Sequence, residues 1–243
     1  MEVKEQLLND LKVPQECVEG LDCSDFPKLV EGTPLWARFY KILDWIWDKN
    51  EAPIKDEKLS RLEAYCCVNA AKDFVEKFFA DETMLDWLDW RFLTSWPWIL
   101  MDAADLYRVG KNGIPCDGER AIWFYEKAYK LDPSMIGALD GIGDVCYHGT
   151  GGVTPDYRRA LKCFQKTDQI WCLGDYYSEG IAVTPDYPLA ISYYLKALER
   201  CVEEDEYLHN EPFIALLHER LSICYEAIGD TKKAIEHKAL IAK

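Results

Sequence analysis

The pentapeptide Val153-Thr154-Pro155-Asp156-Tyr157 returns thirty residues later as Val183-Thr184-Pro185-Asp186-Tyr187. An identical segment that recurs at such a distance within one chain is a signature of internal repetition, and periods of about 20 to 50 residues are typical of solenoids and arrays. The surroundings recur as well: a helical pattern that ends in glycine precedes each copy, and an alanine with an aromatic residue four positions on follows it. This repetition limits the possible folds more than any other feature of the chain.

Three copies of one longer pattern align from about residue 97 onward. They begin with Ala104-x-x-Tyr107-x-x-Gly110, with Gly143-x-x-Cys146-x-x-Gly149 and with Gly174-x-x-Tyr177-x-x-Gly180. Each copy continues with an aspartate and then with an alanine and an aromatic ring, namely Asp117, Ala121 and Tyr125, then Asp156, Ala160 and Phe164, then Asp186, Ala190 and Tyr194. A fourth, different unit follows as Leu221-Ser222-x-x-Tyr225-x-x-x-Gly229-Asp230 and Ala234.

This pattern is typical of two antiparallel helices, A and B, in each copy. The glycines at 110, 149 and 180 stand where helix A must end in a left-handed turn. Thr-Pro-Asp then starts helix B, either with threonine as the cap and proline in the first position or with aspartate as the cap. The small residue of helix A permits a close approach, and the ring of helix B fills the space beside it. Because each pair leaves an apolar face uncovered, the copies must stack.

The order small-x-x-Tyr-x-x-Gly-x-Gly-Val-x-x-Asp-x-x-x-Ala-x-x-x-Tyr-x-x-Ala resembles the Sel-1-like repeat, a relative of the tetratricopeptide repeat with a longer loop between its helices. The fourth unit, with its Gly229-Asp230 turn, resembles a plain tetratricopeptide repeat. Together they cover residues 97–243. The resemblance implies an all-α fold, a right-handed α/α superhelical solenoid of helix pairs, whose concave face holds proteins or peptides. It implies no reaction.

We therefore expect three regions: a tryptophan-rich helical region or cap over 1–96, three repeats over 97–200, and an acidic connection with a tetratricopeptide-like unit over 201–243. Seven of the nine tryptophans lie between Trp36 and Trp98, and we expect most of them to be buried between helices. Helical spacing predicts helices over 3–11, 34–49 and 56–80, and a further one that Asp81 caps. Residues 1–96 resemble no family.

The charge balance of the chain excludes several partner classes. Lys and Arg number 28 and Asp and Glu 43, which gives a net charge of −15 in 243 residues. Such a surface repels nucleic acid and anionic lipid and favours basic partners. The N-terminus carries charges where a signal peptide would be apolar, and no run is long enough to cross a membrane. The ten cysteines fall mostly within helical patterns, so we expect reduced thiols and a cytoplasmic protein.

The resemblance also implies which side chains face the partner. In that geometry, the residue after the small position of helix A points into the concave face. Here these residues are three aspartates, Asp105, Asp144 and Asp175, which we call the aspartate ladder. With their neighbours, the predicted partner-binding residues are Asp105, Arg108, Asp140, Asp144, Tyr147, His148, Trp171, Asp175 and Glu179. We hypothesise that this aspartate ladder binds a basic segment. The alternative is an ordinary solvated surface of an acidic protein.

Catalytic, metal and cofactor sites are not expected. The glycine-rich loop 148–152 lacks the preceding strand that an oxyanion or phosphate loop needs. The four histidines, at 148, 209, 218 and 237, show no metal spacing, and Cys66 and Cys67 point in different directions on a helix. The favoured function is a non-enzymatic module that holds a protein or peptide partner. The alternatives are an immunity protein that neutralises a basic toxin, and an enzyme or regulator whose activity lies in the first hundred residues.

Overall fold

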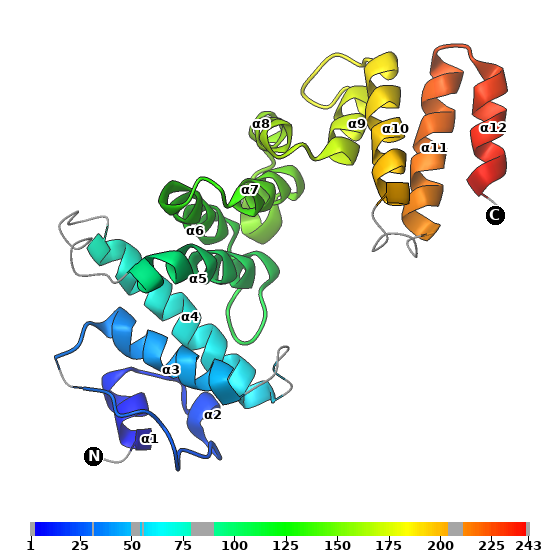
Figure 1. Ribbon diagram of the computed structural model, residues 1–243. Helices are drawn as coiled ribbons and strands as arrows, with labels where there is room; N and C mark the ends of the chain where they lie inside the picture. Colours follow the sequence, from blue (N-terminus) through cyan, green and yellow to red (C-terminus); the bar gives the residue numbers. More distant parts are fainter. Residues whose placement is uncertain are drawn as a thin grey trace. The chain divides into compact units, whose positions relative to one another are not determined.

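The computed structural model divides the chain into two compact units, Met1–Thr154 and Pro155–Lys243, and each is considered by itself (Figure 1). It describes residues 3–30, 32–49, 54, 56–78, 90–203 and 211–241. Within these ranges all regular structure is helical, and consecutive helices pack in pairs. The predicted all-α fold of helix pairs is therefore confirmed. The right-handed superhelix and the three-region division of the chain stay predictions.

The first unit begins with a group of helices, some of which the sequence predicted. The helical turn α1 (Val3–Glu5) continues as a π-helix, Gln6–Asp10, and the short α2 (Gln15–Val18) follows, where the sequence predicted no helix. Two long helices, α3 (Leu35–Lys49) and α4 (Glu57–Phe78), pack against each other and match the predicted helices to within two residues. Most of the helix predicted from Asp81 lies outside the described residues.

Aromatic rings form the core of this group of helices. The ring of Trp96 stacks on Phe74 with centroids 3.9 Å apart and planes 2° apart, and Trp36 meets both rings edge-on. All three side chains are buried. Of the five tryptophans between 36 and 98 whose side chains are described, Trp47 and Trp98 are exposed and the other three are buried, which agrees with the expected role in the core.

The repeats follow as alternating A and B helices, which Figure 1 shows from green to red. In the first unit these are α5 (Trp90–Val109), α6 (Gly118–Leu131) and α7 (Ile136–His148). In the second unit these are α8 (Tyr157–Thr167), α9 (Ile170–Glu179), α10 (Tyr187–Glu203), α11 (Glu211–Ala227) and α12 (Thr231–Ile241). The contacts join α5 to α6, α9 to α10 and α11 to α12, as expected for the first, third and fourth repeat.

The turn between helices A and B has the predicted chemistry. Gly110, Gly149 and Gly180 have φ angles of 71°, 67° and 70°, the left-handed conformation that ends helix A. The next helix begins at an aspartate whose Oδ1 accepts a hydrogen bond from the backbone N–H three residues on, at 3.0 Å in each repeat; these caps are Asp117, Asp156 and Asp186. Aspartate, and not threonine, is therefore the cap.

Tyrosine rings set the distance between helices. A Cβ atom placed on Gly174 would lie 2.5 Å from the ring of Tyr194, as expected for the small residue and ring of one repeat. The ring of Tyr125 instead lies against Gly141 of the following helix α7, where a Cβ atom would be 2.3 Å away. Atoms do not approach so closely, so each glycine is needed for the ring to be buried.

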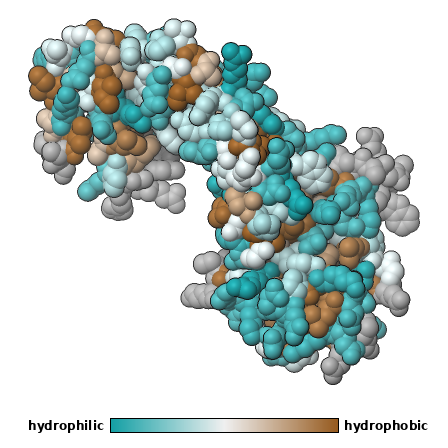
Figure 2. Space-filling model, turned by 180° about the vertical axis from the view of Figure 1, so that it is seen from behind, coloured by the Kyte–Doolittle hydropathy of each residue, from teal (hydrophilic) through white to brown (hydrophobic). Residues whose placement is uncertain are grey.

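On the face that Figure 2 shows, hydrophilic residues alternate with patches of apolar ones. In the second unit, several large apolar side chains of α11, α12 and the turn between them are exposed: Leu216, Ile223, Ile228, Ile235, Leu240 and Ile241. No helix in the described part of the chain is long and apolar enough to cross a membrane.

No disulfide joins the ten cysteines, all of which lie in the described ranges, and eight are buried. Burial raises the pKa of the Cys66 and Cys67 thiols well above the usual value.

The glycine-rich loop after α7 has a packing role. It forms a 3-10 turn, Thr150–Gly152, that lies against the start of α6. Gly151 has a φ of 64°, and a Cβ atom there would lie 2.1 Å from the backbone nitrogen of Gly118. The lack of a side chain therefore lets two backbone segments meet, which accounts for a glycine at this position without an anion or a reaction.

This packing predicts different effects for two neighbouring glycines. Gly152 also has a positive φ, of 86°, but a Cβ atom there would meet no atom within 4 Å. Gly152→Ala should therefore lower the free energy of unfolding by about 1 kcal/mol, because alanine is less stable than glycine in the left-handed conformation. Gly151→Ala should lower the free energy of unfolding by roughly 2 kcal/mol more than Gly152→Ala does, because the backbone of Gly118 must move. Urea unfolding of both variants measures the difference, and equal losses would contradict the packing role.

Candidate partner-binding surfaces

The first aspartate of the predicted ladder is bound within its own repeat. The hydroxyl of Tyr125 on α6 donates to Oδ1 of Asp105 on α5, at 2.7 Å. Arg108 donates to the same oxygen through Nη2 at 2.8 Å, and its Nε donates to the Tyr125 hydroxyl at 3.0 Å. Burial and the bond to Asp105 raise the pKa of Tyr125, so the hydroxyl stays a donor. Asp105 and Arg108 thus neutralise each other.

The third aspartate has the same kind of partner. The Tyr194 hydroxyl donates to Oδ1 of Asp175 at 2.6 Å, and burial together with this bond raises the pKa of Tyr194. Arg220 on α11 lies 3.3 Å from the same oxygen through Nε and 3.1 Å from Glu179 Oε1 through Nη1. Asp175 and Glu179, the two predicted partner-binding carboxylates of the second unit, are therefore both paired with Arg220.

The second aspartate of the ladder, Asp144, has no such partners. The corresponding helix B residue is Phe164, which has no hydroxyl to donate. Among the described residues, none donates a hydrogen bond to Asp144 or forms an ion pair with it. Burial raises the pKa of Asp144, the positive charges of Arg108 and His148 lower it, and the carboxylates of Asp140 and Asp105 raise it by smaller amounts. Asp144 is therefore a half-buried carboxylate that has no hydrogen-bond donor or ion-pair partner of its own among the described residues.

Asp140 lies one turn before Asp144 on α7. Its Oδ1 is buried and accepts no hydrogen bond from any described residue. Buried carboxylate oxygens without a donor are uncommon, because desolvation without a hydrogen bond costs free energy. Tyr147 and His148 end the same helix, with ring centroids 4.9 Å apart and planes 84° apart.

A further carboxylate, Asp102, lies one turn before Asp105 on α5. The pKa of Asp102 is raised to about 6, chiefly by burial and also by the neighbouring charges of Asp105 and Glu63, while Lys111 acts in the opposite direction. It borders a hollow of about 360 Å³. The hollow is lined by Trp47, Glu63, Ala64, Cys67, Asp102, Asp105, Leu106, Arg108, Val109, Lys111 and Asn112. We call Asp102, Asp140 and Asp144 the acidic surface of the first unit.

Glu63 and Trp47 form one wall of this hollow. The indole Nε1–H of Trp47 donates to Glu63 Oε1 at 2.8 Å, which fixes the orientation of the ring. The Trp47 side chain is 38% exposed, so part of its face is open to solvent beside the carboxylates. An aromatic face beside carboxylates is an arrangement that attracts a lysine or arginine side chain.

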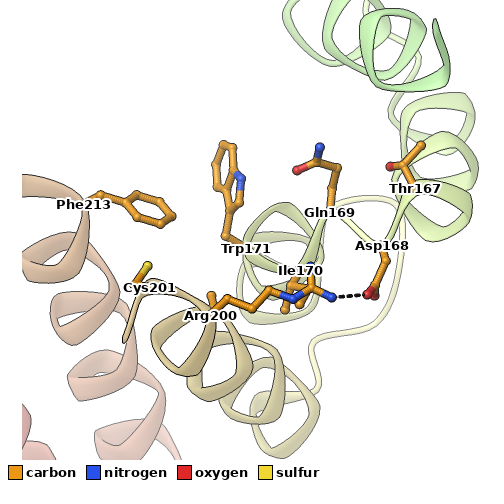
Figure 3. Close-up of a pocket in the computed structure, with 9 residues that line it drawn as sticks. Thr167, Asp168, Gln169, Ile170, Trp171, Arg200, Cys201 and Phe213 are labelled. Carbon is orange, nitrogen blue, oxygen red and sulfur yellow. Dashed lines mark hydrogen bonds and ion pairs between the residues drawn. The ribbon is translucent and has the colours of Figure 1, made fainter. Parts of the chain in front are cut away.

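The predicted residue Trp171 lies in the second unit at a different kind of site. It lines a pocket of about 280 Å³, where its ring faces Phe213 with centroids 6.1 Å apart (Figure 3). Arg200 and Asp168 form an ion pair of 2.6 Å along another side of the pocket. Two aromatic walls and an exposed ion pair make a pocket that fits one apolar side chain with polar groups at its edge.

The nine predicted residues therefore separate into three groups. Asp105 and Arg108 neutralise each other, and Arg220 binds Asp175 and Glu179. Asp140 and Asp144 share the acidic surface, with Tyr147 and His148 beside them on α7. Trp171 lines the aromatic pocket. Sequence reasoning missed Asp102, although its position three residues before Asp105 places both on one helix face. It also missed Arg220 and Phe213, which come from another helix and gave no local signal.

Comparison with known proteins agrees with the helix-pair geometry. The Sel1 repeat model matches residues 100–133, 138–167 and 173–200. The chain thus contains three Sel1 repeats, which lie between residues 100 and 200. Sel1 repeats are generally non-catalytic protein–protein interaction modules.

One solved structure that this chain is similar to is c5321, a protective antigen present in uropathogenic Escherichia coli strains and displaying an SLR fold. The identity is 14% and the TM-score 0.41, over 85% of this chain and 53% of that chain. The present chain thus corresponds to about half the length of that protein. No curated protein matches the chain significantly.

The raised pKa of Asp102 predicts how stability changes with pH. Because the folded-state pKa of about 6 lies above the ordinary value of 3.8, the folded state binds the proton more tightly than the unfolded state. The contribution of Asp102 to stability is therefore fully present below pH 4 and is lost as the pH rises through 6. Water screens part of the effect, because the Asp102 side chain reaches the surface.

Asp102→Asn removes this loss. Thermal unfolding should show that the variant gains stability relative to the wild type as the pH rises from 4 to 7. Asp48→Asn, at an exposed position on α3, serves as the control and should show no such trend. A constant difference between wild type and Asp102→Asn across this range would contradict the environment described for Asp102.

Proposed function

We propose that this protein is a non-catalytic interaction module whose acidic surface binds a basic segment of a protein partner. The observation that carries the proposal is the contrast within the aspartate ladder. Asp105 and Asp175 are bound by a tyrosine and an arginine of this chain, whereas Asp102, Asp140 and Asp144 have no ion pair with any described residue. The carboxylates that have no ion pair within the chain are the ones we propose a partner binds.

Electrostatics favour a cationic partner at this surface. Burial destabilises the charged forms of Asp102 and Asp144, as their raised pKa values indicate, and it outweighs the favourable charges of Lys111 near Asp102 and of Arg108 and His148 near Asp144. A lysine or arginine that docks beside them reverses this cost, because opposite charges attract more strongly where water is partly excluded. The chain's net charge of −15 adds long-range attraction for a basic protein.

The hollow beside Asp102 adds shape to this charge. Its volume of about 360 Å³ has room for a long side chain, and Trp47 presents a ring along which the methylene groups of lysine or arginine can pack. The Trp47–Glu63 hydrogen bond holds that ring in place, so little rotamer entropy is lost on binding. Unlike an ordinary solvated helix face, this surface thus combines burial, charge and an aromatic wall.

The second unit has a separate candidate contact for an apolar side chain. Interface hot spots are commonly aromatic residues in a pocket, and Trp171 and Phe213 form such walls. Asp175 and Glu179, in contrast, are held by Arg220 and are not part of the proposed surface. The aromatic pocket is therefore a second, independent candidate site, which fits one apolar side chain.

Two features that could suggest catalysis have structural explanations instead, which supports the proposal that the protein catalyses no reaction. The tyrosine pKa values are raised by burial and by hydrogen bonds that join helices, which is a structural role. The glycine-rich loop is explained by backbone packing against α6. We also propose a cytoplasmic location, supported by ten cysteines that form no disulfide.

Fluorescence polarisation with labelled peptides tests the acidic surface. The probes are twelve-residue peptides that carry Lys or Arg at varied spacing, and sequence-matched peptides with Gln in those places. We expect the wild type to select basic peptides. The double variant Asp102→Asn/Asp144→Asn should bind them about tenfold more weakly, which corresponds to about 1.4 kcal/mol.

The control variant is Asp44→Asn/Asp48→Asn, which removes the same charge from two exposed positions on α3. It should bind like the wild type if the surface, and not the net charge, recognises the peptide. Equal weakening of both double variants, or selection of peptides without Lys and Arg, would refute the proposed surface. Higher salt should weaken wild-type binding, because screening reduces attraction between charges.

A further inference from the structure

Two histidines of the second unit lie against each other between the last two helices. His218 on α11 and His237 on α12 have their Nδ1 atoms 3.0 Å apart, and their ring centroids are 5.1 Å apart. They are nineteen residues apart in the sequence and are brought together by the packing of α11 on α12. Two imidazole nitrogens that face each other at this distance can either share a proton or bind one cation.

The separation suits one metal ion held by both rings. Metal–nitrogen bonds to histidine are about 2.05 Å long, so two nitrogens 3.0 Å apart would enclose an angle of about 94° at the ion. This lies near the right angle between neighbouring ligands of square-planar or octahedral Ni²⁺ and Cu²⁺. Tetrahedral Zn²⁺ would need a separation of about 3.3 Å, which a small rotation of one ring supplies.

The neighbours of the pair fix one ring and leave a path to the other. Tyr225 stacks on His237 with planes 9° apart, which orients that ring as an outer-shell residue does in metal sites. His218 lines a hollow of about 440 Å³ with Glu211, Ile214 and Leu240. An ion can therefore reach the pair from this side, and water can occupy its remaining coordination positions.

From this geometry we propose that His218 and His237 form a two-histidine site for a divalent transition metal that clamps α12 to α11. Imidazole nitrogen is a preferred ligand of Ni²⁺, Cu²⁺ and Zn²⁺ and a poor one for Mg²⁺ and Ca²⁺. No group of three or more metal-ligating side chains occurs among the described residues, so the site has two protein ligands and open positions. On binding, both Nδ1 atoms offer a lone pair and any Nδ1 proton moves to Nε2 or to solvent.

The clamp would stabilise the C-terminal helix pair. The ion binds only where both helices are folded and in contact, so binding free energy adds to the stability of this pair. Other contacts also join the two helices, among them the ion pair between Lys238 and Glu226. The metal site is independent of the acidic surface, which lies in the first unit.

Isothermal titration calorimetry of the tag-free chain with Ni²⁺ and with Zn²⁺ tests the proposal. We expect one ion per chain in the wild type, together with a rise in thermal unfolding temperature. His237→Gln and His218→Gln should each bind at least about tenfold more weakly and lose the thermal rise, because one ligand is removed. Mg²⁺ should give no binding and no rise.

His148→Gln is the matched control, because His148 lies in the first unit beside Tyr147 and has no histidine partner. It should bind like the wild type. Circular dichroism in EDTA checks that each variant is folded, and either member of the pair provides the test if the other unfolds. Unchanged stoichiometry and affinity in both His218→Gln and His237→Gln would overturn the proposal, as would equal weakening in His148→Gln.

Discussion

The buried tyrosine of helix B is the residue on which both the repeat packing and the proposed surface depend. Its ring lies on a glycine that allows close approach, and its hydroxyl donates to the aspartate of helix A. One side chain thus sets the distance between helices and determines whether that aspartate is available to a partner. A buried hydroxyl needs an acceptor, so Tyr125 and Tyr194 each require their aspartate.

The second repeat departs from this arrangement by one oxygen atom. Phe164 fills the position of the tyrosines but cannot donate, and Asp144 has no other donor among the described residues. The carboxylate that accepts a tyrosine hydrogen bond in the first and third repeats therefore has no such donor in the second, and the proposed surface rests on this difference. With Asp102 and Asp140, Asp144 forms the acidic surface that we propose binds a basic partner.

Local sequence features predicted the fold well because each depends on nearby residues. The left-handed glycines, the aspartate caps and the helices over 34–49 and 56–80 follow from turn chemistry and helical spacing. The site was less predictable. The pairing of Asp175 with Arg220 and of His218 with His237 depends on helices that meet only in the folded chain. The missing hydroxyl of Phe164 was visible in the sequence, but its meaning required the Tyr125–Asp105 hydrogen bond.

Nuclear magnetic resonance of the aspartate side-chain carboxyl carbons tests this account most directly. An arginine-rich peptide is added, and the carboxyl signals of Asp105, Asp144 and Asp175 are followed. The account predicts that the signal of Asp144 shifts with peptide concentration, while those of Asp105 and Asp175 stay nearly constant because their tyrosine and arginine partners remain bound. Equal shifts of all three signals, or shifts of Asp105 and Asp175 without Asp144, would contradict it.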